Sequence, residues 1–193
     1  MTGNEGLWHF EGNADDSSGN SRNGTVTGAT LIAGRVGSDA YNFAASDYIN
    51  FGAMSNFISA NFSISFWIKP DALWSPSTWD AVIGASNAFV WSEGLGVFWQ
   101  NSSTLRFFVG QYNSTYTDIS LSSAANWSHI VVTYDGSHIS AFLNGSFVSS
   151  TAYSSALTGL ANNFQASRLG THSGFEGALD EVAIWSRALT ASE

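Results

Sequence analysis

The feature that most constrains this chain is an alternation of apolar and polar side chains with a period of two. Residues 61–69 read Asn-Phe-Ser-Ile-Ser-Phe-Trp-Ile-Lys, so that nearly every second side chain is apolar. Because successive side chains of a strand point to opposite faces, one face of this segment is expected to be buried. The side chains expected on that face are Phe62, Ile64, Phe66 and Ile68. Residues 127–134 alternate in the same way, and both segments predict β-strands.

Turn signals divide the chain into many short strands. Asp135-Gly136 and Asn144-Gly145 allow the positive φ angles of tight hairpin turns, and residues 140–143 between them are expected to form the middle strand of a meander. Further short strands are expected at residues 6–10, 24–27, 40–43, 48–51, 81–84, 97–99, 105–109 and 179–185. Many short strands without a linker-like stretch predict one all-β domain over residues 1–193, a sandwich or a barrel.

Composition excludes several other classes of protein. Only 11% of the residues are charged, against about 25% in average soluble domains, and coiled coils and helical bundles need charged outer faces. The six Lys and Arg residues are scattered singly and the net charge is −9, so nucleic acids and anionic membranes are poor partners. The chain has no cysteine, no signal-peptide pattern and no apolar run near the roughly 20 residues of a membrane span. We therefore expect no membrane insertion.

Several longer motifs, taken together, resemble one family. They are Gly-Leu-Trp-His-Phe-Glu-Gly at 6–12, Asp-Ser-Ser-Gly-Asn-Ser-Arg-Asn-Gly-Thr at 16–25, the strand at 61–71, Trp-Ser-His-Ile-Val-Val-Thr-Tyr-Asp-Gly at 127–136, Phe-Leu-Asn-Gly at 142–145 and the closing segment 175–190. In this order they resemble bacterial laminin-G-like, concanavalin A-like jelly-roll domains. The resemblance implies a two-sheet antiparallel jelly-roll sandwich. It says little about function, because that sandwich serves lectins, adhesins, accessory modules and a minority of enzymes.

The segment from Glu11 to Gly24 is rich in oxygen-bearing side chains among glycines, as a calcium site requires. The family resemblance implies that one calcium ion ties this loop to an acid near the chain end, Asp180 or, less readily, Glu181. The expected ligands are the side chains of Asp16, Ser18, Asn23 and Asp180 with backbone carbonyls around Gly24, and Glu11 is a reserve candidate. The alternative is that the polar residues of this segment are ordinary turn formers that cap their own backbone.

Catalytic motifs are missing from the sequence. Jelly-roll glucanases carry two carboxylates at alternate positions of one strand, whereas Asp180 and Glu181 are adjacent and face opposite ways on a regular strand. No Gly-x-Ser-x-Gly elbow occurs, and the four histidines lack a zinc-ligand spacing. A lone strand histidine such as His129 is expected to be a hydrogen-bonded packing residue. We expect no enzymatic activity.

The aromatic residues fall into two groups. Six lie on strand patterns and are expected in the core: Trp8, Phe10, Phe62, Phe66, Trp127 and Trp185. Others lie in or beside the loops between residues 73 and 116, where amide side chains also gather. Rings and amides together suit a neutral saccharide, so this region is the predicted ligand site, with Trp74, Trp79, Trp91, Trp99, Asn101 and Tyr112. The alternative is that these rings cover a second small core or a subunit interface.

Two functions fit these features. The first is a non-catalytic, calcium-stabilised module that binds glycans or surface ligands, outside the cell or at its surface, as part of a larger exported protein. The second is a structural protein, such as a virion decoration or tail component, which makes protein–protein contacts and fits a chain that stands alone. The exposed aromatic residues suit both functions, and the sequence does not predict the oligomeric state.

Overall fold

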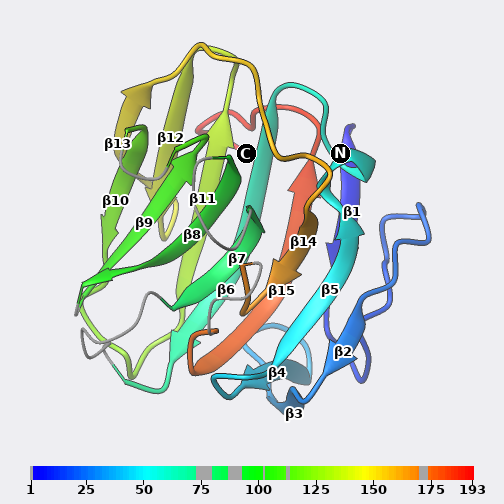
Figure 1. Ribbon diagram of the computed structural model, residues 1–193. Coiled ribbons are helices and arrows are strands. Elements are labelled where there is room, and N and C mark those ends of the chain that lie inside the picture. The colour runs from blue at the N-terminus through cyan, green and yellow to red at the C-terminus, as the bar shows by residue number, and fades with distance from the viewer. Residues whose placement is uncertain (1, 73–79, 87–92, 102, 112–113, 170–173) are drawn as a thin grey trace.

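Two antiparallel β-sheets packed face to face make up the molecule (Figure 1). The computed structural model describes residues 2–72, 80–86, 93–101, 103–111, 114–169 and 174–193. The described residues contain no α-helix, only a short 3-10 turn, η1, at Met54–Asn56. The predicted two-sheet antiparallel sandwich is confirmed.

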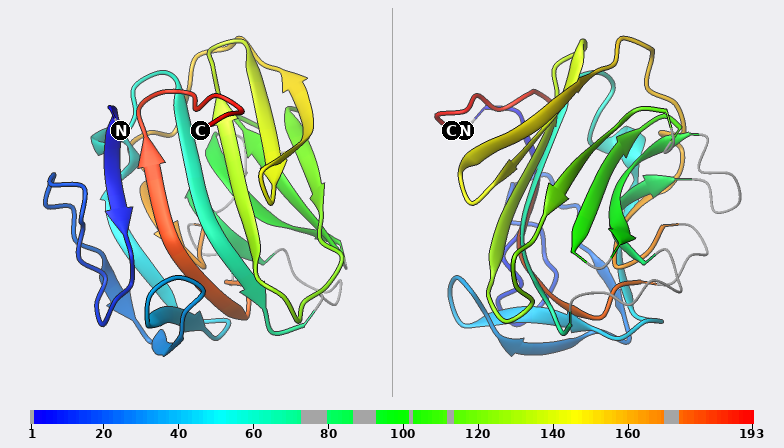
Figure 2. Two further views of the ribbon diagram at one scale, coloured as in Figure 1. Left: turned by 180° about the vertical axis from the view of Figure 1, so that it is seen from behind. Right: turned by 90° about the vertical axis from the view of Figure 1, so that its left-hand side faces the viewer.

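One sheet has eight strands in the order β13-β12-β11-β6-β15-β4-β3, and β1 also pairs with β15. Its strands are β1 (Asn4–Trp8), β3 (Thr30–Ala33), β4 (Asp39–Phe43), β6 (Phe62–Pro70), β11 (Ser128–Tyr134), β12 (His138–Leu143), β13 (Ser146–Ala152) and β15 (Gly177–Trp185). The first and last strands of the chain are thus neighbours, and Figure 2 shows the two termini at the same end of the molecule.

The other sheet has seven strands in the order β10-β9-β8-β7-β14-β5-β2. Its strands are β2 (Thr25–Thr27), β5 (Tyr48–Ala53), β7 (Ala81–Ser86), β8 (Gly94–Asn101), β9 (Thr104–Val109), β10 (Tyr116–Ser120) and β14 (Asn163–Ala166). Consecutive strands β7 to β10 form a meander, and β14 inserts between β7 and β5.

The core lies between the sheets and follows the period-two pattern. The four apolar side chains expected to point inward from β6 are at most 1% exposed: Phe62, Ile64, Phe66 and Ile68. β6 lies in the middle of its sheet, paired with β11 on one side and β15 on the other. Because both neighbouring strands satisfy its backbone hydrogen bonds, β6 is a rigid support for the side chains on its outward face.

The two predicted hairpin turns differ. Asn144 and Gly145 have φ angles of 52° and 79°, as a tight two-residue turn requires. At the other turn only Gly136 has a positive φ, and the Asp135 carboxylate accepts hydrogen bonds from the N–H groups of Ser137 and His138. The turn at Asp135-Gly136 is therefore a longer loop, closed by the aspartate side chain.

Three strands were not expected from the sequence: β3, β10 and β14. All four residues of β3 are exposed, so that strand has no buried face to produce an alternation. β10 and β14 are short, with five and four residues.

Candidate ligand-binding groove

The outward face of the eight-stranded sheet carries small side chains at its centre. Ser65 on β6 lies between Val131 on β11 and Ala183 on β15, and the side chains of these three residues point away from the core. Their larger neighbours, such as Trp67, stand higher above the sheet. A row of small residues flanked by large ones leaves a depression, and its floor is formed by strands in the middle of the sheet.

Two adjoining cavities, of about 520 and 380 Å³, occupy this depression. Both are lined by Ser65, His129 and Trp185, so they form one continuous hollow, which we call the outer groove. Its other lining residues are Asn4, Leu7, His9, Ser17, Ser18, Val36, Trp67, Glu181 and Ala183 in the larger cavity, and Val131, Thr133, Phe142, Gly145 and Leu189–Glu193 in the smaller one.

Two loops border the outer groove. Figure 2 shows the C-terminal tail (red) and the loop between β3 and β4 (blue) projecting from opposite ends of this face. The tail is fastened to the floor through Ser63, whose hydroxyl donates to the Arg187 carbonyl at 2.9 Å and accepts from the Leu189 N–H at 2.8 Å. Arg187 also pairs with Glu193 at 2.6 Å, and this hydrogen bond lowers the pKa of Glu193 to about 2. Hydrogen bonds and one ion pair thus hold the tail against the sheet.

Trp67 and His129 form a flat, amphipathic part of the outer groove. They are directly paired across β6 and β11, and their ring centroids are 5.0 Å apart with an interplanar angle of 35°. The Arg35 guanidinium lies 4.6 Å from the Trp67 ring centroid. The His129 ring nitrogen Nε2 shares a 2.8 Å hydrogen bond with the Ser65 hydroxyl. Burial lowers the pKa of His129 below 6.5, so its imidazole is neutral at neutral pH.

A bulge in β15 positions Glu181, one of the two acids that line the outer groove. Register shifts between Asp180 and Ala183, and Glu181 adopts a φ angle of 50°, which is unusual for a residue with a side chain. The bulge turns the Glu181 carboxylate toward His9, whose Nδ1 lies 2.8 Å from it. β15 exchanges one neighbour for another at this point, pairing with β4 before the bulge and with β1 after it.

The same bulge changes the position of Trp185. The sequence predicts Trp185 in the core between the sheets. The structure corrects this: Val182 and Ile184 fill the core, and Trp185 points to the outer groove, where its side chain is 9% exposed. Its indole N–H is buried and has no hydrogen-bond acceptor among the described residues. An unpaired buried donor is costly, by about 1–3 kcal/mol, and is uncommon in native folds.

The predicted calcium ligands of the N-terminal loop gather around Asp16, but as a hydrogen-bond network. Asp16 Oδ1 accepts from the N–H groups of Leu7 and Ser18, and Oδ2 accepts from the Ser18 hydroxyl and the Arg22 N–H, at 2.8–3.0 Å. Asn23 Oδ1 accepts from the Asp16 N–H. Burial opposes ionisation of Asp16, but these donors outweigh it and lower its pKa. Both oxygens of this carboxylate already carry two donors, so Asp16 does not fit a cation ligand in this arrangement. Gly24 follows in the loop, and its N–H donates to the Ala14 carbonyl.

Asp180 belongs to a different network. Its Oδ2 accepts from the N–H groups of Arg35 and Val36 at 2.7 and 3.0 Å, and its Oδ1 accepts from the Glu181 N–H. Burial raises the pKa of Asp180, and the negative charge of Glu11 raises it further. Glu11 itself accepts hydrogen bonds from Ser38 in the same loop. Among the described residues, no three acidic or histidine side chains gather closely enough to form a metal site by themselves.

The predicted aromatic ligand site is only partly described. For Trp99 the prediction of a ligand-binding role is wrong. Its side chain is 2% exposed, because the alternation of β8 places it on the inner face with Leu95 and Val97. A ring packed there is not free to stack on a ligand. Asn101 is exposed at the end of β8 and accepts a hydrogen bond from the Ser103 N–H. Trp74, Trp79, Trp91 and Tyr112 lie outside the described residues, and their role stays a prediction.

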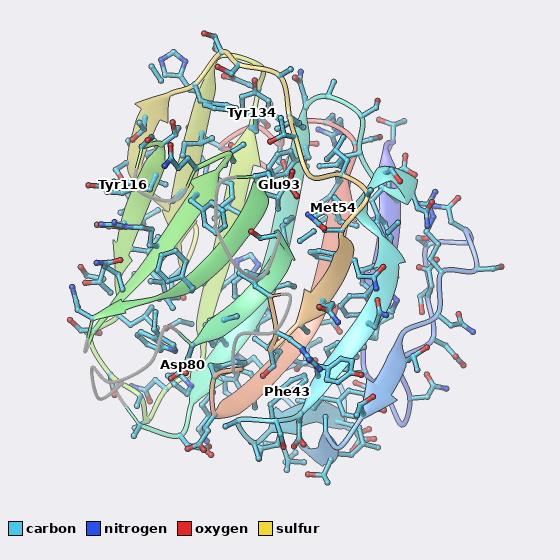
Figure 3. The ribbon with its side chains drawn as sticks, in the orientation of Figure 1. Phe43, Met54, Asp80, Glu93, Tyr116 and Tyr134 are labelled. Carbon is cyan, nitrogen blue, oxygen red and sulfur yellow. The ribbon has the colours of Figure 1, made fainter. Side chains whose placement is uncertain are left out.

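Part of the outer face of the seven-stranded sheet, on β9 and β10, is covered by contacts between its own side chains. Arg106 pairs with Asp118 through two hydrogen bonds of 2.8 and 2.9 Å. Its guanidinium also lies 3.4 Å from the ring centroid of Tyr116, which Figure 3 shows on β10 at the edge of this face. Phe98 and Phe108 pack in a small second cluster nearby. Phe98 and Phe108 were not among the aromatic residues of the predicted ligand site, so the alternative of a second core for those residues stays a prediction.

The sequence reading missed the outer groove as a site, although it contained a signal. The alternation of β6 places Trp67 and Ser65 outward, and that of β11 does the same for His129. Aromatic or imidazole rings on the otherwise polar faces of two strands are the pattern that could have indicated the groove. Trp185 and Glu181 could not have been placed, because the bulge that orients them has no signature in the sequence.

Comparisons with known proteins concern the fold. A family model described as the concanavalin A-like lectin/glucanases superfamily matches residues 43–193. Domain 4 of AbnA, an extracellular arabinanase from Geobacillus stearothermophilus solved in complex with arabinotriose, is similar with a TM-score of 0.79, 21% identity and coverage of 98% of this chain and 95% of that chain. A search of curated protein sequences finds no significant match.

Two toxin domains are also similar. The binding domain of Paraclostridial Mosquitocidal Protein 1 has a TM-score of 0.76 and 22% identity, with coverage of 98% of this chain and 50% of that one. The binding domain of botulinum neurotoxin DC, in complex with SialylT, has a TM-score of 0.72 and 14% identity, with coverage of 99% and 50%. This chain spans about half the length of each toxin domain. No helix in the described part of the chain is long and apolar enough to cross a membrane.

Proposed function

Because the chain belongs to the concanavalin A-like lectin/glucanases superfamily, as its motifs indicated, we propose that it is a non-catalytic recognition module that binds glycans in the outer groove. One observation carries this proposal. Trp67 and His129 present neighbouring rings, tilted by 35° to each other, beside the Ser65 hydroxyl, on strands in the middle of a sheet. Sugar rings have apolar C–H faces and hydroxyl edges, so they need an aromatic plane next to hydrogen-bonding groups.

The charges of the outer groove favour a neutral saccharide. Its described lining includes Glu181 and Glu193, and the whole chain carries a net charge of −9. The Arg35 guanidinium lies against Trp67 and is the cation available to an anionic sugar. Arabinotriose and SialylT, the ligands of two structural neighbours, represent a neutral and an anionic glycan. We expect binding of the neutral class.

The proposal of a non-catalytic module is supported by the state of the two groove acids. Glycoside hydrolysis needs one carboxyl group free to give a proton and another free to attack or to activate water. Glu181 is paired with His9 at 2.8 Å, and Glu193 is paired with Arg187 at 2.6 Å. Both carboxylates therefore have structural partners. An extracellular location belongs to the same proposal, because one structural neighbour is part of an extracellular enzyme.

The proposal is tested by glycan binding to paired variants. A glycan array that includes arabinotriose and sialylated glycans, followed by calorimetry, should show binding of neutral glycans by the parent. Trp67→Ala should weaken that binding at least about tenfold, because it removes the stacking plane. Trp127→Ala is the matched control, since Trp127 is half-buried and lines neither cavity. Equal loss in both variants, with folded circular dichroism spectra, would refute the assignment of the site.

Calcium stabilisation is a separate part of the proposal and rests on the family resemblance. Asp180 and Glu11 are the better candidates to hold the ion, because burial raises the pKa of Asp180 and the negative charge of Glu11 raises it further. A cation near them would offset that cost. Backbone carbonyls and neutral side-chain oxygens would complete the six to eight ligands that calcium takes. The role would be structural, and the glycan-binding proposal does not depend on it.

A further inference from the structure

We propose that the outer groove continues onto the hairpin formed by β12 and β13, where Phe142 and Phe147 form an additional subsite, and that the occupant is a linear neutral oligosaccharide lying across the strands. This inference rests on the proposed glycan-binding function and extends it from a single sugar to a chain. It adds a residue, Phe147, that lies outside both cavities.

Phe147 is the most exposed large apolar side chain among the described residues, at 60%. It lies directly opposite Phe142 in the hairpin, and the two ring centroids are 5.6 Å apart with an interplanar angle of 71°. Phe142 lines the smaller cavity, so the pair continues the lining of the outer groove beyond its edge. A ring this exposed on a rigid hairpin has room to accept a ligand face.

The aromatic side chains follow a line across the sheet. Trp67 is paired with His129, and Val131, two residues farther along β11, is paired with Phe142, which is paired with Phe147. This line crosses β6, β11, β12 and β13 and leads away from Glu181 on β15. Three strand spacings separate Trp67 on β6 from Phe147 on β13, which corresponds to about 14 Å. That length suits a chain of several sugar units and exceeds what one or two units would cover.

The β13 strand at this end of the line is uncharged, and its exposed apolar residues Phe147 and Val148 lie among Ser and Thr residues. β13 contains no ionisable side chain between Ser146 and Ala152, and Val148 beside Phe147 is 38% exposed. A neutral sugar meets this surface with its C–H face and leaves its hydroxyls in water. A second copy of this chain is a less suitable occupant, because two molecules of net charge −9 repel each other.

The test is a ladder of linear oligosaccharides, from two to six units, built from the neutral glycan that binds the parent most strongly on the array. Affinity for the parent should rise as the oligosaccharide grows beyond two units. Phe147→Ala should weaken binding of the six-unit chain about five- to tenfold and leave the two-unit affinity unchanged. Leu31→Ala is the matched control, because Leu31 is 40% exposed on the opposite edge strand, β3. It should change neither affinity.

The outcomes separate the two proposals. If no glycan on the array binds, the proposed function fails and this inference fails with it. If glycans bind but affinity is flat beyond two units, or Phe147→Ala binds the six-unit chain like the parent, only the subsite is refuted. A branched or sialylated glycan as the strongest binder also refutes it. Light scattering tests whether a second copy of the chain occupies the hairpin instead. If the parent is a dimer and Phe147→Ala is a monomer, the hairpin is a self-association surface and the inference is overturned.

Discussion

His129 is a neutral, partly buried imidazole between an indole ring and a serine hydroxyl, and this position makes the stability of the protein depend on pH. Burial lowers its pKa in the folded state below the ordinary value of 6.5. Between these two values the unfolded chain binds more protons than the folded one, so protonation favours unfolding. The described groups that contact the ring are the Trp67 indole and the Ser65 hydroxyl, both uncharged. Neither carries a negative charge that would offset the cost of burying an imidazolium.

We therefore expect the free energy of unfolding to fall as the pH drops below about 6.5, with the contribution of His129 fully present above that value. Urea denaturation between pH 5 and 8 measures it. In His129→Gln this part of the profile should flatten, because glutamine does not titrate. His138→Gln, at an exposed position on β12, should keep the slope of the parent. Parallel profiles for all three proteins would show that His129 is not the group responsible.

Individual residues were predictable where an unbroken strand governs them. The alternation of β6 correctly assigned Phe66 to the core and Trp67 to the opposite face. Trp99 was placed in a ligand site because it lies near loop residues in the sequence, but its strand alternation puts it in the core. Proximity in sequence to a loop was a weaker guide than strand period. The orphan N–H of Trp185 could not be predicted at all, since it depends on three-dimensional packing.

At the scale of elements, the N-terminal loop is organised by one carboxylate. Asp16 accepts four hydrogen bonds, from donors on β1 and on both sides of the loop turn. Asp16→Ala would leave the N–H groups of Leu7 and Arg22 without this acceptor. We expect a loss of about 1–3 kcal/mol in the free energy of unfolding, measured by urea denaturation.

Asp15→Ala is the control for this variant. Asp15 is exposed, and its side chain accepts a hydrogen bond only from the neighbouring Asn13 among the described contacts. Its replacement should change stability by less than about 0.5 kcal/mol. If both variants unfold at the same urea concentration, Asp16 does not organise the loop.

Elements were predictable where local chemistry specifies them. Asn144-Gly145 forms the tight turn that its residues favour, whereas Asp135-Gly136 forms a longer loop because the aspartate side chain bonds backbone N–H groups. The bulge at Glu181 is different. It lies where β15 changes its neighbour from β4 to β1, so it is a property of the assembled sheet. The groove acid and the orientation of Trp185 follow from that bulge, and so this part of the site lay beyond sequence reasoning.

At the scale of the whole molecule, the sandwich brings the chain ends together without making Asp16 and Asp180 partners. β1 pairs with β15, as expected from a jelly roll whose first and last strands are close. Asp16 holds the loop after β1, while Asp180, before the bulge, holds the loop after β3. The family resemblance correctly indicated the sandwich. Which of these acids hold a calcium ion stays a prediction.

The calcium proposal can be separated from the hydrogen-bond networks by melting curves in EDTA and in millimolar calcium. An ion bound to the folded state alone stabilises it by RT ln(1 + [L]/Kd), which is about 2.7 kcal/mol at a hundredfold excess over Kd. For a domain of this size, that corresponds to a rise in melting temperature of roughly 5–10 °C in the parent. Asp180→Asn should lose the rise, because it removes the charge of the buried acid beside Glu11.

Asp16→Ala is the comparison variant. It should melt lower than the parent in both buffers and still gain from calcium, since the carboxylate of Asp16 in the parent is already saturated by hydrogen-bond donors. Identical curves for the parent in both buffers would contradict the metal proposal, and the carboxylate–backbone hydrogen bonds would then hold this end of the sandwich on their own.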